Sequence, residues 1–123
     1  MLHCFPLSGD PSNPSAAGVE GMLKLYEHCI RNCYFSGPTY FSYILQQIKE
    51  SAEQIKGGNE YIILLIITDG QINDMSQVKS LILDCCELPL SVVIIGVGEC
   101  DFTLMEQLNG VLNILLERQQ VGG

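Results

Sequence analysis

One carboxylate stands where the sequence favours a functional site. The run Ile62–Ile67 is continuously apolar and is followed at once by Thr68, Asp69 and Gly70. A short, branched, apolar run predicts a strand that is buried on both faces, as in parallel sheets. Because ligands of such sheets bind beyond the carboxyl ends of the strands, Asp69 is a candidate ligand for a cation or a partner. The simpler interpretation, that Asp69 only shapes a local turn, fits the same residues.

Sulfur and imidazole groups offer a second kind of chemistry. His3, Cys4, Cys29 and Cys33 supply the nitrogen and sulfur donors that zinc prefers, and Cys29 and Cys33 stand one helical turn apart. The usual Cys-x-x-Cys pair is missing, however, and free cysteines are among the most buried residue types. Packing is therefore the favoured role of these thiols, and a small zinc-binding domain stays open as an alternative.

Catalytic motifs are not found in the sequence, so we expect a protein that is not an enzyme. Neither a Gly-x-Ser-x-Gly motif nor a Gly-x-x-x-x-Gly-Lys-Ser/Thr loop accompanies the two histidines, His3 and His28. A receiver domain would use Asp69 as a phosphoacceptor and would need a lysine after a later strand. The segment Ser91–Gly98 is followed by Glu99 and by no nearby lysine. A receiver-like phosphoacceptor domain stays a second alternative, by analogy of fold alone.

The composition describes a soluble protein of one domain, residues 1–123. Of the 123 residues, 47% are hydrophobic and 16% are charged, and no apolar run approaches the ~20 residues of a spanning helix. The start of the chain has no secretory pattern, so we expect a cytoplasmic protein with reduced cysteines. The net charge of -8 argues against a nucleic-acid partner, because six basic residues cannot form an extensive phosphate-binding patch.

The apolar spacing predicts the elements that position Asp69. After a loop rich in proline and glycine at residues 5–18, helices are predicted over 19–34 and 41–55. Strands are predicted at Tyr61–Ile67 and Ser91–Val97, and they should pair in parallel. Between them a helix carries Val78, Leu81, Ile82 and Cys85, with Asp74 or Ser76 as its cap. Asp101 should cap a further short helix that ends at Asn109 and Gly110, so the fold class is α/β.

Four motifs of this chain resemble the copine family. They are "PSNPSAAGVEGML", "GPTYF", "YIILLIITDGQINDM" and "LPLSVVIIGVGECDFTLMEQLNG", in the family's order, and together they run from about Phe5 to Gly110. The resemblance is to the von Willebrand factor A-type domain of the copines. It implies a doubly wound, mostly parallel sheet of Rossmann-like type, and a protein-interaction module with a metal-ion-dependent adhesion site.

The resemblance also implies a ligand set for that site. The family combines an Asp-x-Ser-x-Ser loop, a threonine and an aspartate, and here Thr39 and Asp69 match the last two. Such oxygen ligands suit Mg²⁺ or Mn²⁺. The segment "DPSNPS" offers Asp10, Ser12 and Ser15, but the last spacing is one residue too long, so we interpret it as a loop. We expect a partial metal site, in a domain truncated at its start.

Further expectations concern the ends of the chain and its partners. The family's first strand would lie before Met1, and residues 111–123, which could form a strand or a helix, do not resemble the family. We therefore expect an incomplete sheet whose exposed edges allow self-association. Whole copines also carry two calcium-dependent phospholipid-binding domains. The resemblance thus implies intracellular protein partners for this chain, and contact with the plasma membrane only through domains that lie outside it.

Overall fold

The computed structural model of the protein describes residues 3–110. The chain forms two compact units, the first ending at Pro38 and the second beginning at Thr39. Within the described residues, no helix is both long enough and apolar enough to cross a membrane.

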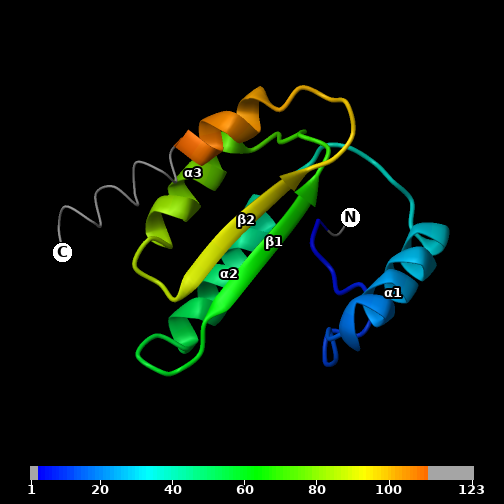
Figure 1. The fold of residues 1–123 in the computed structure, drawn as a ribbon, viewed down its shortest axis with the longest axis horizontal. Helices are drawn as coiled ribbons and strands as arrows, with labels where there is room; N and C mark the ends of the chain where they lie inside the picture. Colours follow the sequence, from blue (N-terminus) through cyan, green and yellow to red (C-terminus); the bar gives the residue numbers. More distant parts are fainter. Residues whose placement is uncertain (1–2, 111–123) are drawn as a thin grey trace. The chain divides into compact units, whose positions relative to one another are not determined.

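The first unit consists of a loop and one amphipathic helix, α1 (Gly18–Asn32; Figure 1). The prediction over 19–34 is confirmed except at its end, where Cys33 leaves the helix with an extended backbone (φ -109°, ψ 145°). Two ion pairs of the i,i+4 type, Glu20 with Lys24 and Glu27 with Arg31, stabilise the polar face. No residue of α1 is buried, and its apolar stripe is exposed at Val19, Met22, Leu23, Tyr26 and Ile30.

The second unit is built on two parallel strands, β1 (Ile62–Thr68) and β2 (Leu90–Gly96). The pairing runs in register from Ile62 opposite Leu90 to Thr68 opposite Gly96. Both predicted strands are confirmed, each displaced by one residue, and α3 (Met75–Asp84) connects them. The α/β class is therefore confirmed, while the doubly wound order stays a prediction, because the described residues contain two strands only.

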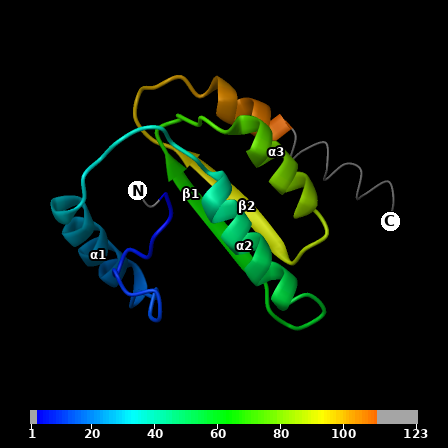
Figure 2. The same cartoon turned by 180° about the vertical axis from the view of Figure 1, so that it is seen from behind.

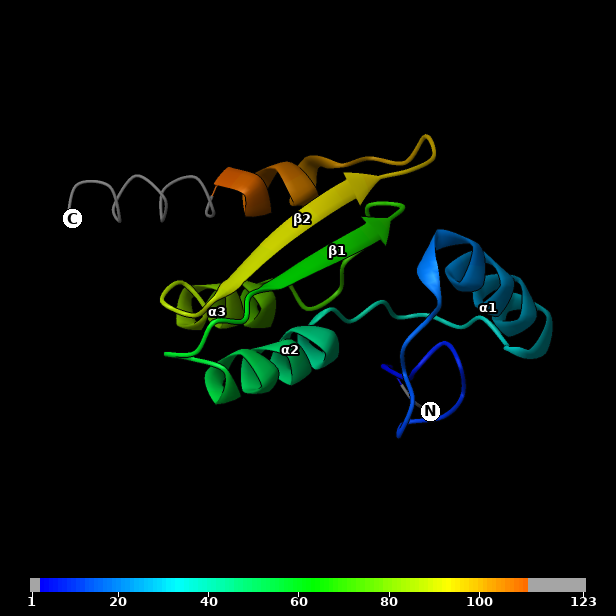
Figure 3. The same cartoon turned by 60° about the horizontal axis from the view of Figure 1, so that its bottom comes forward.

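Three helices of this unit gather on one face of the sheet. They are α2 (Ser42–Gln54) and α3, which lie on the same side of the strands in Figures 2 and 3, and the helical residues 103–110, which contribute Met105 and Leu108 to the same core. Their buried side chains form one core with the inward side chains of the strands. The buried members are Phe41, Leu45, Ile72, Val78, Ile82, Met105 and Leu108. This core packs against the strands whose ends carry the loops of the candidate site.

The opposite face of the sheet differs from the prediction. The apolar runs predicted strands covered on both sides, yet alternate side chains of both strands are between 45% and 70% exposed. These are Ile63, Leu65 and Ile67 of β1, and Val93 and Ile95 of β2. The prediction that both faces are covered was wrong for the described residues, because the buried side chains of α2, α3 and residues 103–110 belong to one core on the other face.

The two helix starts predicted from acidic residues have different outcomes. Asp101 accepts the backbone N–H of Thr103 at 2.9 Å and caps the last described helix, as predicted. Asp74 precedes α3, but its side chain makes no capping bond to that helix. Asn109 and Gly110 are helical and are the last described residues, so the predicted end of this helix at these two residues stays a prediction. The tail at residues 111–123 lies outside the described residues.

Candidate functional site

Asp69 lies in the loop that follows β1, at the carboxyl end of the sheet. One of its oxygens, Oδ1, accepts the backbone N–H of Gln71 at 3.1 Å, and Thr68 Oγ1 likewise accepts the N–H of Gly70 at 3.2 Å. The prediction that Asp69 shapes a local turn therefore holds for its oxygen Oδ1. Asp69 is nevertheless exposed, so the group that forms the turn also presents negative charge beyond the strand end.

Thr39 lies in the segment that enters α2 and is joined to the same loop. Its backbone N–H donates to Asn73 Oδ1 at 2.7 Å, and its carbonyl oxygen accepts the N–H of Asn73 at 2.9 Å. Asn73 follows Asp69 by four residues. The two predicted ligands therefore belong to two segments that a single residue holds together. Nothing local in the sequence marks Asn73 for this role, because its partner lies 34 residues earlier.

Asp74 extends this connection and corrects a prediction. Its side chain is 8% exposed, and its two oxygens accept the backbone N–H groups of Phe41 (3.1 Å) and Ser42 (2.9 Å). Phe41 is the N-cap residue of α2 and has no side-chain acceptor of its own. Asp74 therefore satisfies the start of α2, where free N–H groups and the helix dipole favour a negative charge, instead of the start of α3.

Two glycines make room for Phe102 at the ends of the strands. A Cβ atom on Gly96 would lie 2.7 Å from Phe102 Cε1, and one on Gly70 would lie 2.9 Å from Phe102 Cδ1. Gly70 also has a φ of +101°, which other residues rarely adopt. Next to this ring, the hydrogen bonds from Thr103 hold the pKa of Asp101 below its usual value. The loops after β1 and β2 are thus fixed against one aromatic ring.

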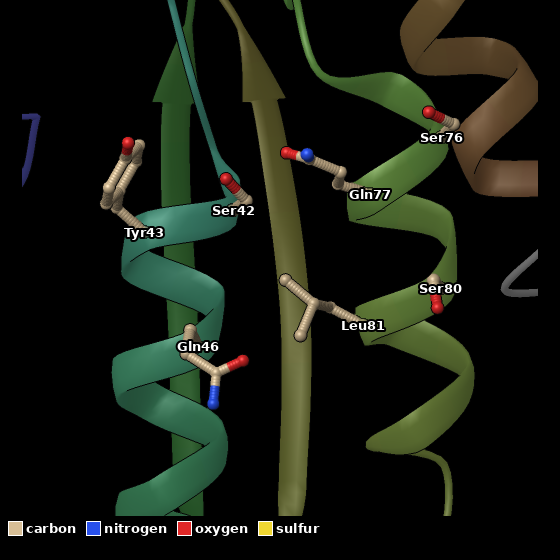
Figure 4. Close-up of a pocket in the computed structure, with 7 residues that line it drawn as sticks. All are labelled: Ser42, Tyr43, Gln46, Ser76, Gln77, Ser80 and Leu81. Atoms are coloured by element: carbon tan, nitrogen blue, oxygen red, sulfur yellow. The ribbon is translucent and has the colours of Figure 1, made fainter.

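A groove of about 550 Å³ runs between α2 and α3 (Figure 4). Its lining residues are uncharged, and all but Leu81 carry a polar group: Ser42, Tyr43, Gln46, Ser76, Gln77, Ser80 and Leu81. No histidine, carboxylate or lysine accompanies these serines, so the lining offers hydrogen bonds without a nucleophile and base pair. A neighbouring pocket includes Asp74, but both of its oxygens already accept backbone N–H groups.

Comparison with known proteins gives the family. A family model described as Copine matches residues 1–121, which is nearly the whole chain. The chain belongs to the copine family. It is 44% identical over 110 residues to Copine-C of Dictyostelium discoideum, an alignment that covers 88% of this chain and 20% of Copine-C. The chain thus spans about a fifth of the length of this curated copine, and the predicted copine resemblance is confirmed.

The two residues predicted to belong to an adhesion site have the kind of oxygen ligand that a hard cation binds. Asp69 and Thr39 supply a carboxylate and a hydroxyl oxygen, which suit Mg²⁺ or Mn²⁺. They are too few to hold an ion alone, and within residues 3–110 no three residues of the His, Cys, Asp and Glu types gather as a metal site. Asp10 is occupied locally, because it accepts both the N–H (3.0 Å) and the hydroxyl (2.6 Å) of Ser12. These bonds lower the pKa of Asp10.

The four residues of the zinc alternative are not brought together into one site. His3, Cys4, Cys29 and Cys33 do not form one cluster in the described part of the chain. Two of the four predicted ligands are close together, since Cys29 Sγ and Cys33 Sγ lie 3.3 Å apart. Zinc in a structural site takes four such ligands, so this geometry does not support the alternative.

Proposed function

We propose that this chain is a non-enzymatic protein-interaction module of a copine-like protein, in which Asp69 and Thr39 form part of a metal-ion-dependent adhesion site. The observation that carries the proposal is the double hydrogen bond between Thr39 and Asn73. It holds the segment of one proposed ligand against the loop of the other. Such support matters because an ion site needs its ligands fixed before the ion arrives.

Two further observations support an ion and a partner at this edge. Asp69 is exposed after a buried strand end, with only one of its oxygens in a hydrogen bond with Gln71. The chain carries a net charge of -8, which favours divalent cations near its surface. When bound, Mg²⁺ or Mn²⁺ would offer an open coordination position to a carboxylate of the partner. Asp69 and Thr39 would anchor the ion, and Asn73 would position Thr39.

The proposed setting follows from the family. We propose that the module binds intracellular proteins in the cytoplasm, and that it reaches the plasma membrane only within a protein that also has calcium-dependent phospholipid-binding domains. A nucleic-acid partner is not proposed, because the chain is acidic.

The test compares two proteins. One is the 123-residue chain, and the other is the same chain extended by a strand and loop that carry Asp-x-Ser-x-Ser. Calorimetry with Mn²⁺ should show weak binding to the chain, which Asp69→Ala hardly changes, because the other anchoring groups are missing. The extended protein should bind tightly and should lose that binding on Asp69→Ala or Thr39→Val. Asp10→Asn is the matched control, since it removes an acidic group from the local turn only.

Two results would contradict the proposal, and a third would correct only the number of ligands that it expects to be needed. Tight Mn²⁺ binding by the extended protein that survives Asp69→Ala would place the ion elsewhere. Equal losses from Asp10→Asn and Asp69→Ala would mean that general negative charge, and not a built site, attracts the ion. Tight binding by the unextended chain that Asp69→Ala abolishes would show that the ligands already present suffice.

A further inference from the structure

A pair of thiols closes the last turn of α1. Cys29 Sγ and Cys33 Sγ lie 3.3 Å apart, and both side chains are half-buried. Residues four apart share one face of a helix, so the two side chains meet. Their hydrogen bond raises the pKa of the Cys29 thiol above its usual value of 9.0.

The two cysteines stand as separate thiols. Both are free, and their Sγ atoms lie 3.3 Å apart, whereas the S–S bond of a disulfide is about 2.05 Å long. Cys29 belongs to the last turn of α1, and Cys33 follows its last residue, Asn32. The two thiols are therefore close enough to act on one bound atom.

The number of ligand atoms at the pair decides which metal ion it can bind. No third residue of the His, Cys, Asp and Glu types joins the pair to form a metal site in residues 3–110. Zinc and the hard cations need more ligands. Soft monovalent ions of the copper group prefer thiolates and are satisfied by two of them. Tyr26 and Ile30 each precede one of the cysteines by three residues, the spacing of neighbours on one face of a helix.

We propose that Cys29 and Cys33 form a two-thiolate site for a soft monovalent cation, with Cu⁺ as the physiological ion. The ion binds as both S–H protons leave to solvent, so two neutral thiols and one positive ion become a complex of charge -1. No electron is transferred. Cys33 lies beyond the last helical residue, so its side chain can adjust to the ion without loss of helical hydrogen bonds.

The first experiment titrates the full chain, kept reduced, against the coloured complex of Cu⁺ with bicinchoninic acid. The wild-type chain should withdraw one equivalent of Cu⁺. Cys29→Ser and Cys33→Ser should each weaken binding by roughly 100-fold or more, because the second sulfur no longer acts at a high effective concentration. Cys100→Ser is the matched control, since Cys100 is exposed and lies outside the pair.

The second experiment locates the pair directly. Phenylarsine oxide joins two thiols by forming two As–S bonds and releasing water. Trypsin cleaves after Lys24, Arg31 and Lys49, so Cys29 and Cys33 fall on different peptides. Mass spectrometry should find peptides 25–31 and 32–49 joined through arsenic, and either serine variant should abolish this product.

Three results would overturn the proposal. The first is retention of the Cu⁺ equivalent by the double variant Cys29→Ser, Cys33→Ser, and the second is an equal loss in Cys100→Ser. The third is an arsenic bridge found at Cys85 and Cys86 in place of the α1 pair. Since Asp69 and Thr39 take no part, failure of this site would leave the proposed adhesion site untouched.

Discussion

Replacing Asp74 by alanine removes the acceptor for the first N–H groups of α2. Two hydrogen bonds are lost, from Phe41 (3.1 Å) and Ser42 (2.9 Å), and both end on a carboxylate that is only 8% exposed. Hydrogen bonds to charged groups contribute about 1.5–3 kcal/mol each, while removal of a capping side chain costs about 0.5–2 kcal/mol. Because water can reach part of the α2 start after the change, we expect a loss of about 2–4 kcal/mol.

The assay is urea unfolding of the 123-residue chain, followed by circular dichroism. With a slope of about 1–3 kcal/mol per molar urea, the midpoint should fall by roughly 1–2 M while the slope stays constant. Hydrogen exchange should also quicken at the amides of Phe41 and Ser42. Glu60→Gln is the matched control, because Glu60 is exposed and precedes β1. If the free energy of unfolding of Asp74→Ala lies within ~0.5 kcal/mol of that of this control, the contact of Asp74 with the start of α2 does not stabilise the fold.

Three further predictions concern the strand ends. Gly96→Ala should lower stability by about 1–3 kcal/mol, because its Cβ would meet Phe102 at 2.7 Å; Phe102→Leu in the same chain should reduce that loss in urea unfolding. Asp101→Asn should lower the melting temperature near neutral pH but not in strong acid, because a lowered carboxyl pKa stabilises above the usual 3.8 and its contribution fades as pH falls through the native value. Asp69→Ala should leave the free energy of unfolding in urea within ~0.5 kcal/mol of the wild-type value, since its one hydrogen bond is exposed.

Features that depend on near neighbours were predictable. β1 and β2 follow from unbroken apolar runs, and the cap at Asp101 follows from a bond to the second residue after it. The assignment of Asp69 and Thr39 as metal ligands comes from short copine motifs and stays a prediction. In each case the information lies in a few consecutive residues, which a sequence displays directly.

Features that join distant segments were not predictable. Asn73 and Asp74 look like the start of α3, and their bonds reach back more than 30 residues to the entry of α2. The sheet was wrongly predicted to be covered on both faces, because an apolar residue type does not show whether another element packs on it. Ile63 and Ile67 are apolar residues of the kind found in cores, yet they lie exposed on the face of the sheet opposite the core of this unit. Burial is a property of the assembly of elements and not of one strand.

The two apolar faces of each strand have a consequence for the alignment of the sheet. A shift of β2 by one residue would exchange its inner and outer side chains, and since both sets are aliphatic, the hydrophobic pattern would resist such a slip only weakly. The ends must then define the register. At one end Tyr61 Oη and Ser91 Oγ lie 2.6 Å apart, and at the other only Gly96 fits beside Phe102. A slip would bring Ile95 or Val97 under the ring, so the strand interiors hold the sheet together while its ends decide how it is aligned.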